Sequence, residues 1–139
     1  MKALVTGLLL AACFASGAQA ACSVPNSSSP NVRAALERAG GWPISDEKCN
    51  FLRANNLYIG ISAMSTVLGG VSVGWAVATL VDRNNTISDK SQSSTHVNKE
   101  SASMDVAERL MVDAIRDAIK GLDFQTAPRE VADYRRKAK

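Results

Sequence analysis

The middle of the chain alternates between two kinds of side chain. From Val71 to Val81, β-branched or aromatic residues occupy every second position, and the residues between them are small except for Leu80. The same period of two runs from Leu57 to Met64, and Gly69-Gly70 separates the two runs. Alternation with β-branched residues is typical of strands, and two glycines suit a tight turn. We therefore predict a β-hairpin whose small-residue face lets a helix pack closely.

A second interpretation of this segment is a single transmembrane helix. Residues 57–81 carry no charge, are long enough to span a bilayer, and contain Gly70 and Gly74 at G-x-x-x-G spacing. Glycines and β-branched residues give the segment a poor helix propensity, however. The positive charges on its two flanks also define no orientation. We favour the hairpin.

A polar segment and an amphipathic helix follow. Residues 86–97 have a very polar centre, which suits an exposed edge strand or two short strands joined by a loop. Residues 103–120 place Met and Ala along one stripe and alternating charges opposite, and Asp105 and Glu108 have the spacing of a capping box. We expect this helix to cover the sheet, although the stripe also suits a partner-binding face.

Two short helices are predicted before the hairpin. Asn31 is positioned to cap the first, over residues 31–39, and Ser45 to cap the second. The second helix carries Cys49 on its apolar face. We expect Trp42 to pack in the loop between the helices, with a binding role as the alternative.

The expected fold is therefore α+β. A short disulfide-tied helical pair precedes an antiparallel β-meander of about three strands, and one long C-terminal helix packs on the sheet. The predicted organisation is a signal peptide (1–20), a flexible lead-in (21–30), one domain (31–124) and a basic C-terminal tail (125–139).

The N-terminal residues have the pattern of a bacterial secretory leader. Lys2 precedes an uncharged apolar run, and Ala18-Gln19-Ala20 provides small residues for cleavage after Ala20. We expect a periplasmic or secreted protein. Two alternatives place it at the membrane: an uncleaved anchor, or a lipoprotein modified at Cys13, because residues 10–13 resemble a lipobox.

Cleavage after Ala20 removes Cys13 and leaves Cys22 and Cys49. In an oxidising compartment such a pair forms a disulfide, and closing a loop of about 27 residues stabilises the fold by roughly 3 kcal/mol. A zinc site needs about four ligands, which the chain lacks.

Composition excludes several function classes. The net charge is +3, and it falls to +2 when Lys2 is removed, which is too small to indicate nucleic-acid binding. The chain has one histidine, His96, which we expect to be a surface residue or a satisfied one. It has no nucleophile elbow, phosphate loop or zinc-protease motif. We predict no enzymatic activity, no cofactor and no metal; a small hydrolase using His96 is the less favoured hypothesis.

These observations favour a small exported, non-catalytic binding or accessory protein of the bacterial cell envelope. We expect it to act through a face or edge of the sheet, on a protein partner or a second copy. The basic tail offers peripheral contact with anionic membranes. The candidate surface residues are Trp42, Trp75, Arg135, Arg136 and Lys137.

Overall fold

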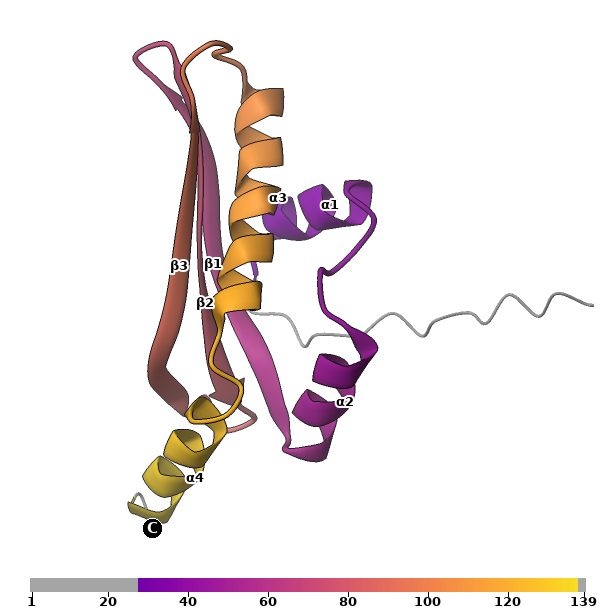
Figure 1. The fold of residues 1–139 in the computed structure, drawn as a ribbon, viewed down its shortest axis with the longest axis vertical. Helices are drawn as coiled ribbons and strands as arrows, with labels where there is room; N and C mark the ends of the chain where they lie inside the picture. Colours follow the sequence, from indigo (N-terminus) through magenta and orange to yellow (C-terminus); the bar gives the residue numbers. More distant parts are fainter. Residues whose placement is uncertain (1–27, 138–139) are drawn as a thin grey trace, which may run out of the picture.

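The computed structural model describes residues 28–137, which form a three-stranded sheet and four helices (Figure 1). The predicted signal peptide, Cys13 and Cys22 lie outside these residues. In chain order the elements are α1 (Pro30–Arg38), α2 (Asp46–Ala54), β1 (Leu57–Leu68), β2 (Val71–Asp82), β3 (Ile87–Asn98), α3 (Met104–Gly121) and α4 (Ala127–Lys137).

The predicted hairpin is confirmed. β1 and β2 pair antiparallel in continuous register from Leu57 opposite Asp82 to Leu68 opposite Val71. Gly69 and Gly70 make the turn with positive φ angles of 55° and 81°, which glycine adopts without strain. Residues 57–81 therefore do not form the alternative transmembrane helix. Within residues 28–137, no helix is both long and apolar enough to cross a bilayer.

The polar segment after the hairpin is one continuous edge strand. β3 pairs with β2, so the sheet is an antiparallel meander in the order β1-β2-β3. Its ladder is irregular between Thr79 and Val81, where the register shifts near the start of β3. The two outer strands differ, because β1 has no charged residue whereas β3 contains Asp89 and Lys90.

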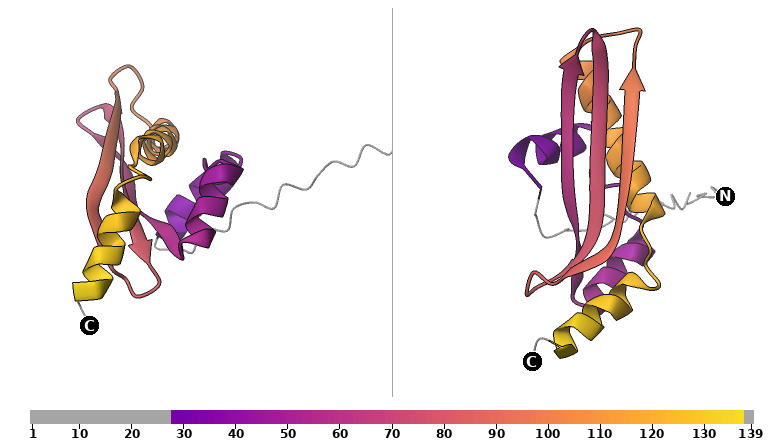
Figure 2. Two further views of the ribbon diagram at one scale, coloured as in Figure 1. Left: turned by 60° about the horizontal axis from the view of Figure 1, so that its bottom comes forward. Right: turned by 90° about the vertical axis from the view of Figure 1, so that its left-hand side faces the viewer.

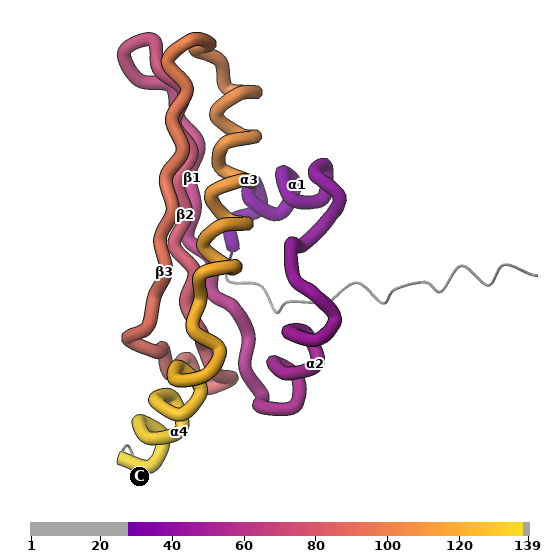
Figure 3. The backbone as a smooth tube through the Cα atoms, viewed as in Figure 1, coloured from indigo at the N-terminus to yellow at the C-terminus, as the bar shows by residue number. Residues whose placement is uncertain are grey.

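The long helix α3 packs on one face of the sheet, as predicted. Ser72, Gly74, Ala76 and Ala78 of β2 are buried beneath it. A Cβ atom added to Gly74 would lie 2.0 Å from the Met111 backbone nitrogen, so only glycine allows this approach. α1 packs against α3, and α2 against β1 (Figure 3). The core lies between the sheet and these helices.

Two of the predicted helix caps are wrong. Ser29 caps α1 by accepting a hydrogen bond from the Val32 N–H at 3.4 Å, so the helix begins before Asn31. Ser103 caps α3 in the same way at 3.2 Å from Val106 N, so Asp105 already lies within the helix. The prediction for Ser45 is confirmed, because its hydroxyl accepts from Lys48 N.

The C-terminal segment, expected to be a basic tail over 125–139, instead contains α4. Ala127 and Val131 of this helix are buried in the core, and α4 contacts β2 and β3. Cys49 is buried on α2. Because Cys22 lies outside the described residues, the disulfide stays a prediction.

Candidate binding surface

The second face of the sheet is not covered by any described helix (Figure 2, right). Strand alternation and the register place every second residue of β1 and β2 on this open face, and the paired residues of β3 on either side of its irregular segment at 88–90. Its members are Tyr58, Gly60, Ser62, Met64, Thr66 and Leu68 of β1; Val71, Val73, Trp75, Val77, Thr79 and Val81 of β2; and Ile87, Ser91, Ser93, Thr95 and Val97 of β3.

None of these residues carries a charge. The charged Asp89 lies between Ile87 and Ser91, in the irregular part of the β2–β3 ladder, and its carboxylate accepts a hydrogen bond from Tyr134 of α4. Four of the five large hydrophobic side chains that are most exposed among the described residues lie on it: Met64 (49%), Leu68 (64%), Ile87 (55%) and Val97 (52%). Solvent-facing strands normally alternate apolar inward with polar outward. Exposed apolar side chains gathered on the outward side are instead typical of a protein interaction site.

A shallow hollow of about 280 Å³ lies at the end of the open face near the β2–β3 turn. Gly60 has no side chain there, and Val77 and Ile87 contribute apolar atoms to the lining. At the rim, the Tyr58 hydroxyl donates a hydrogen bond to Asn85 Oδ1 at 3.1 Å. The hollow is therefore suited to an apolar group that projects from a partner.

The five candidate surface residues do not gather at one place. Trp75 is half-buried on the open face, between Met64 and Thr95 on the neighbouring strands. Trp42 packs against the core, which is the role expected for the loop between α1 and α2. Arg135, Arg136 and Lys137 all lie on α4.

Two of the three arginines of α4, Arg135 and Arg136, are paired within the protein. Arg135 Nε donates to Asp82 Oδ2 at 2.5 Å, and Arg136 pairs with Asp133. Asp82 is fully buried and also accepts hydrogen bonds from the backbone N–H groups of Asn84 and Thr86, each at 2.7 Å. Burial alone would raise the pKa of Asp82, but these hydrogen bonds and the Arg135 charge together hold the pKa below its usual value.

Two further bonds hold α4 to β3. Ser88 donates to Glu130, and the Tyr134 hydroxyl donates to Asp89, both at 2.5 Å. The hydrogen bond to Asp89 is the main cause that raises the pKa of Tyr134 to about 12, and burial and the nearby acidic charges add to it. Sequence reasoning missed these contacts, because each partner is far away along the chain.

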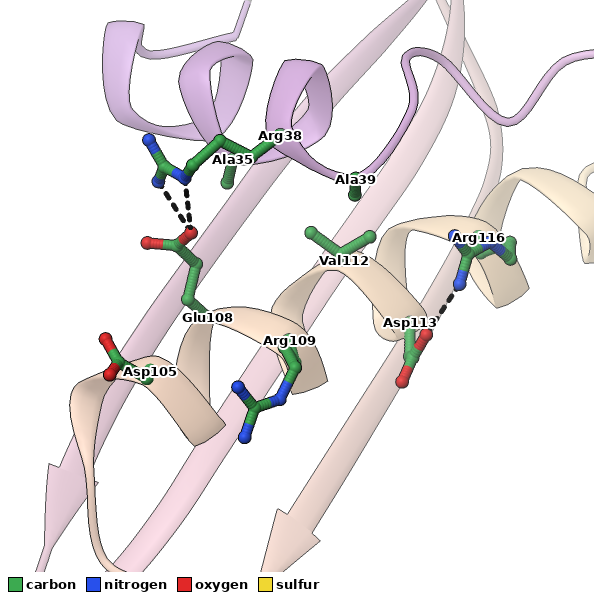
Figure 4. A pocket seen from close by; sticks show the side chains of 9 residues that line it. All are labelled: Ala35, Arg38, Ala39, Asp105, Glu108, Arg109, Val112, Asp113 and Arg116. Atoms are coloured by element: carbon green, nitrogen blue, oxygen red, sulfur yellow. Dashed lines mark hydrogen bonds and ion pairs between the residues drawn. The ribbon is translucent and has the colours of Figure 1, made fainter.

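A second concavity, of about 470 Å³, lies between α1 and α3 (Figure 4). Ala35 and Ala39 face Val112 across it, and charged side chains of both signs surround it. Arg38 is paired with Glu108 at 2.6 Å, and Arg116 with Asp113 at 2.6 Å. Three basic and three acidic side chains line it in all, so it presents no excess charge of either sign.

The cluster around His96 does not have the geometry of a catalytic triad. His96 Nε2 lies 2.9 Å from Asp117 Oδ2 and 3.4 Å from Ser94 Oγ. A triad needs the serine and the carboxylate on opposite ring nitrogens, because one nitrogen must accept while the other donates. Both groups lie on Nε2, so the histidine connects β3 to Asp117 of α3 in an arrangement unlike a triad.

Within residues 28–137, no group of three or more His, Cys, Asp or Glu side chains is placed to hold a metal ion. No protein-family model, curated protein or solved structure matches this chain. The open face, with its exposed apolar side chains, is the strongest candidate site. The sequence indicates this face through the alternation of β2, because the larger residues of that strand lie on the uncovered side and the small ones beneath α3.

Proposed function

We propose that the protein is a small exported, non-catalytic binding or accessory protein of the bacterial cell envelope that acts through the open face of its sheet. The uncharged open face is the observation that carries the proposal. The leader pattern of residues 1–20 supports export, with cleavage near Ala20 and a periplasmic or secreted product. A disulfide between Cys22 and Cys49 belongs to the same proposal.

The face is favoured over the edges of the sheet. The edge of β3 contains charged residues and contacts α3 and α4. The edge of β1 is uncharged but offers only backbone groups in a single row, whereas the open face offers apolar side chains from all three strands. Removing such side chains from water is the main favourable contribution to most protein association.

Membrane contact through α4 is a weaker alternative. A basic segment binds anionic lipid through charges that are free to approach the head groups. Arg135 is held by buried Asp82 and Arg136 by Asp133, so the helix presents less free charge than its sequence suggests.

Photocrosslinking in living cells tests the proposal. The full-length chain is expressed with p-benzoylphenylalanine at Val77, in the centre of the open face, and in a matched strain at Arg109, an exposed position on α3. We expect ultraviolet light to produce a larger adduct with the probe at Val77 and none at Arg109. Absence of an adduct at Val77, or equal adducts at both positions, would refute a binding role for the open face.

A further inference from the structure

The two ends of the open face have opposite shapes. The end near the β2–β3 turn has the hollow over Gly60, lined by Val77 and Ile87. The end near the β1–β2 turn has projecting side chains, because Leu68 and Val97 are more than half exposed. One surface thus carries both a recess and apolar groups able to fill a recess.

We propose that a second copy of this chain covers the open face, with the two sheets packed face to face about a two-fold axis that lies between them and runs across the strands. This axis reverses the strand direction of the second sheet. Leu68 and its neighbours in each copy then lie over the hollow of the other copy. The inference rests on the proposed function of the open face and names its occupant.

The size of the face agrees with a dimer. Each of the three strands has twelve residues. At about 3.3 Å per residue and about 4.8 Å between strands, the face measures about 40 Å by 14 Å, or about 560 Å² per copy. Two copies would bury about 1,100 Å² in total, not counting the extra area of projecting side chains. This area reaches the range of roughly 1,000–1,200 Å² where specific interfaces begin.

The chemistry of the face also suits a symmetric contact. In a two-fold interface each residue near the axis meets itself or a close neighbour, so a charge there would face a like charge. The paired residues of the open face near this axis have none. Its large apolar residues concentrate on central β2, whereas β3 contributes the hydroxyls of Ser91, Ser93 and Thr95, which gives an apolar centre with a polar rim on that side. Trp75, on the central strand, then lies near the axis.

Sedimentation equilibrium of the protein purified after export of the full-length chain tests this dimer. We expect the mass of two copies at micromolar concentration. Val77→Lys, which places a charge on each side of the interface, should weaken the dimer at least tenfold, whereas Arg109→Glu on α3 should leave it unchanged. A monomeric wild type, or a Val77→Lys protein that still dimerises like the wild type, would overturn the proposal. Circular dichroism verifies that each variant is folded.

A crosslink map tests the arrangement without depending on a destabilising variant. p-Benzoylphenylalanine replaces the exposed Leu68, and copies with and without ¹⁵N are mixed so that mass spectrometry identifies links between chains. We expect links from residue 68 to the region of Gly60 and Ile87 in the other copy. Links to the helices, or none between copies, would contradict the two-fold packing. If Val77 crosslinks a different protein in cells while purified protein stays monomeric, the open face binds a partner and only the dimer fails.

Discussion

At the scale of single residues, Asp82 joins three parts of the molecule. Asp82 is the last residue of β2. Its carboxylate accepts hydrogen bonds from the backbone N–H groups of Asn84 and Thr86 in the β2–β3 turn, and it pairs with Arg135 of α4. A buried carboxylate is stable only when such partners replace the water that it has lost. The turn and the C-terminal helix therefore depend on one side chain.

Replacing this residue tests that dependence. Asp82→Asn keeps the size but removes the charge partner of Arg135, whose side chain is 36% exposed, and it weakens the bonds to the turn. We expect a loss of roughly 2 kcal/mol in the free energy of unfolding, measured by urea denaturation at pH 7. Asp133→Asn is the matched control on α4, because its pair with Arg136 is exposed and should contribute less than about 1 kcal/mol. Equal effects of the two substitutions would show that Asp82 has no special role.

The same residue predicts an acid dependence. The folded-state pKa of Asp82 is lower than the unfolded value near 3.8, so its ionised form stabilises the fold at any pH above that value. The contribution falls as the pH drops below about 4 and is lost when the pH passes the folded-state pKa. We expect the unfolding free energy of the wild type to decrease more steeply than that of Asp82→Asn in this window. Parallel curves would contradict the assignment.

At the scale of elements, the contact between α3 and β2 depends on small residues and on the hydrogen bonds of Ser72. Gly74 lets the backbone of α3 approach, and the Ala side chains of both elements continue the close contact. The hydroxyl of buried Ser72 lies 2.7 Å from the Ser101 carbonyl and accepts from the Ser103 N–H at 3.0 Å, which fixes the start of the helix.

Gly74→Ala is the sharpest test of this packing. The new methyl group would lie 2.0–2.6 Å from backbone atoms of Leu110 and Met111, so α3 must move away from the sheet. We expect a destabilisation of roughly 1–3 kcal/mol, as for other overpacked cores, measured by thermal unfolding. Gly121→Ala is the control, because its methyl group meets only the flexible Gln92 side chain and should change stability little. An unchanged melting temperature for Gly74→Ala would contradict the close approach.

The elements that the sequence predicts best are those with a strong local period. The hairpin and α3 follow from alternation and from an amphipathic stripe, because burial on one side imposes these patterns directly. α4 was missed because its charged sequence has little apolar surface, and its order depends on Val131 in the core and on Arg135 meeting Asp82. The hollow over Gly60 was missed for a similar reason, since its walls come from all three strands.

At the scale of the whole molecule, the two faces of the sheet differ in what surrounds them. One face is closed by helices that pack against small residues, and the other shows Trp75 and several valines to its surroundings without a charge. A surface of this kind promotes association whenever a complementary surface is present. The proposed export would bring the protein into a compartment without the cytosolic reducing systems, where we expect Cys22 and Cys49 to form a disulfide.

The intact mass of the protein recovered after export tests that covalent state. We expect the mass of residues 21–139 less two hydrogen atoms, because cleavage after Ala20 removes Cys13 and leaves Cys22 and Cys49 to form a disulfide. Cys22→Ser should lower the unfolding free energy by about 3 kcal/mol, since the bridge closes a loop of about 27 residues. Cys13→Ser is the control and should leave the mature mass unchanged. A lipid-bearing product that begins at Cys13 would instead show a lipoprotein. A mass with two free thiols would contradict the predicted disulfide.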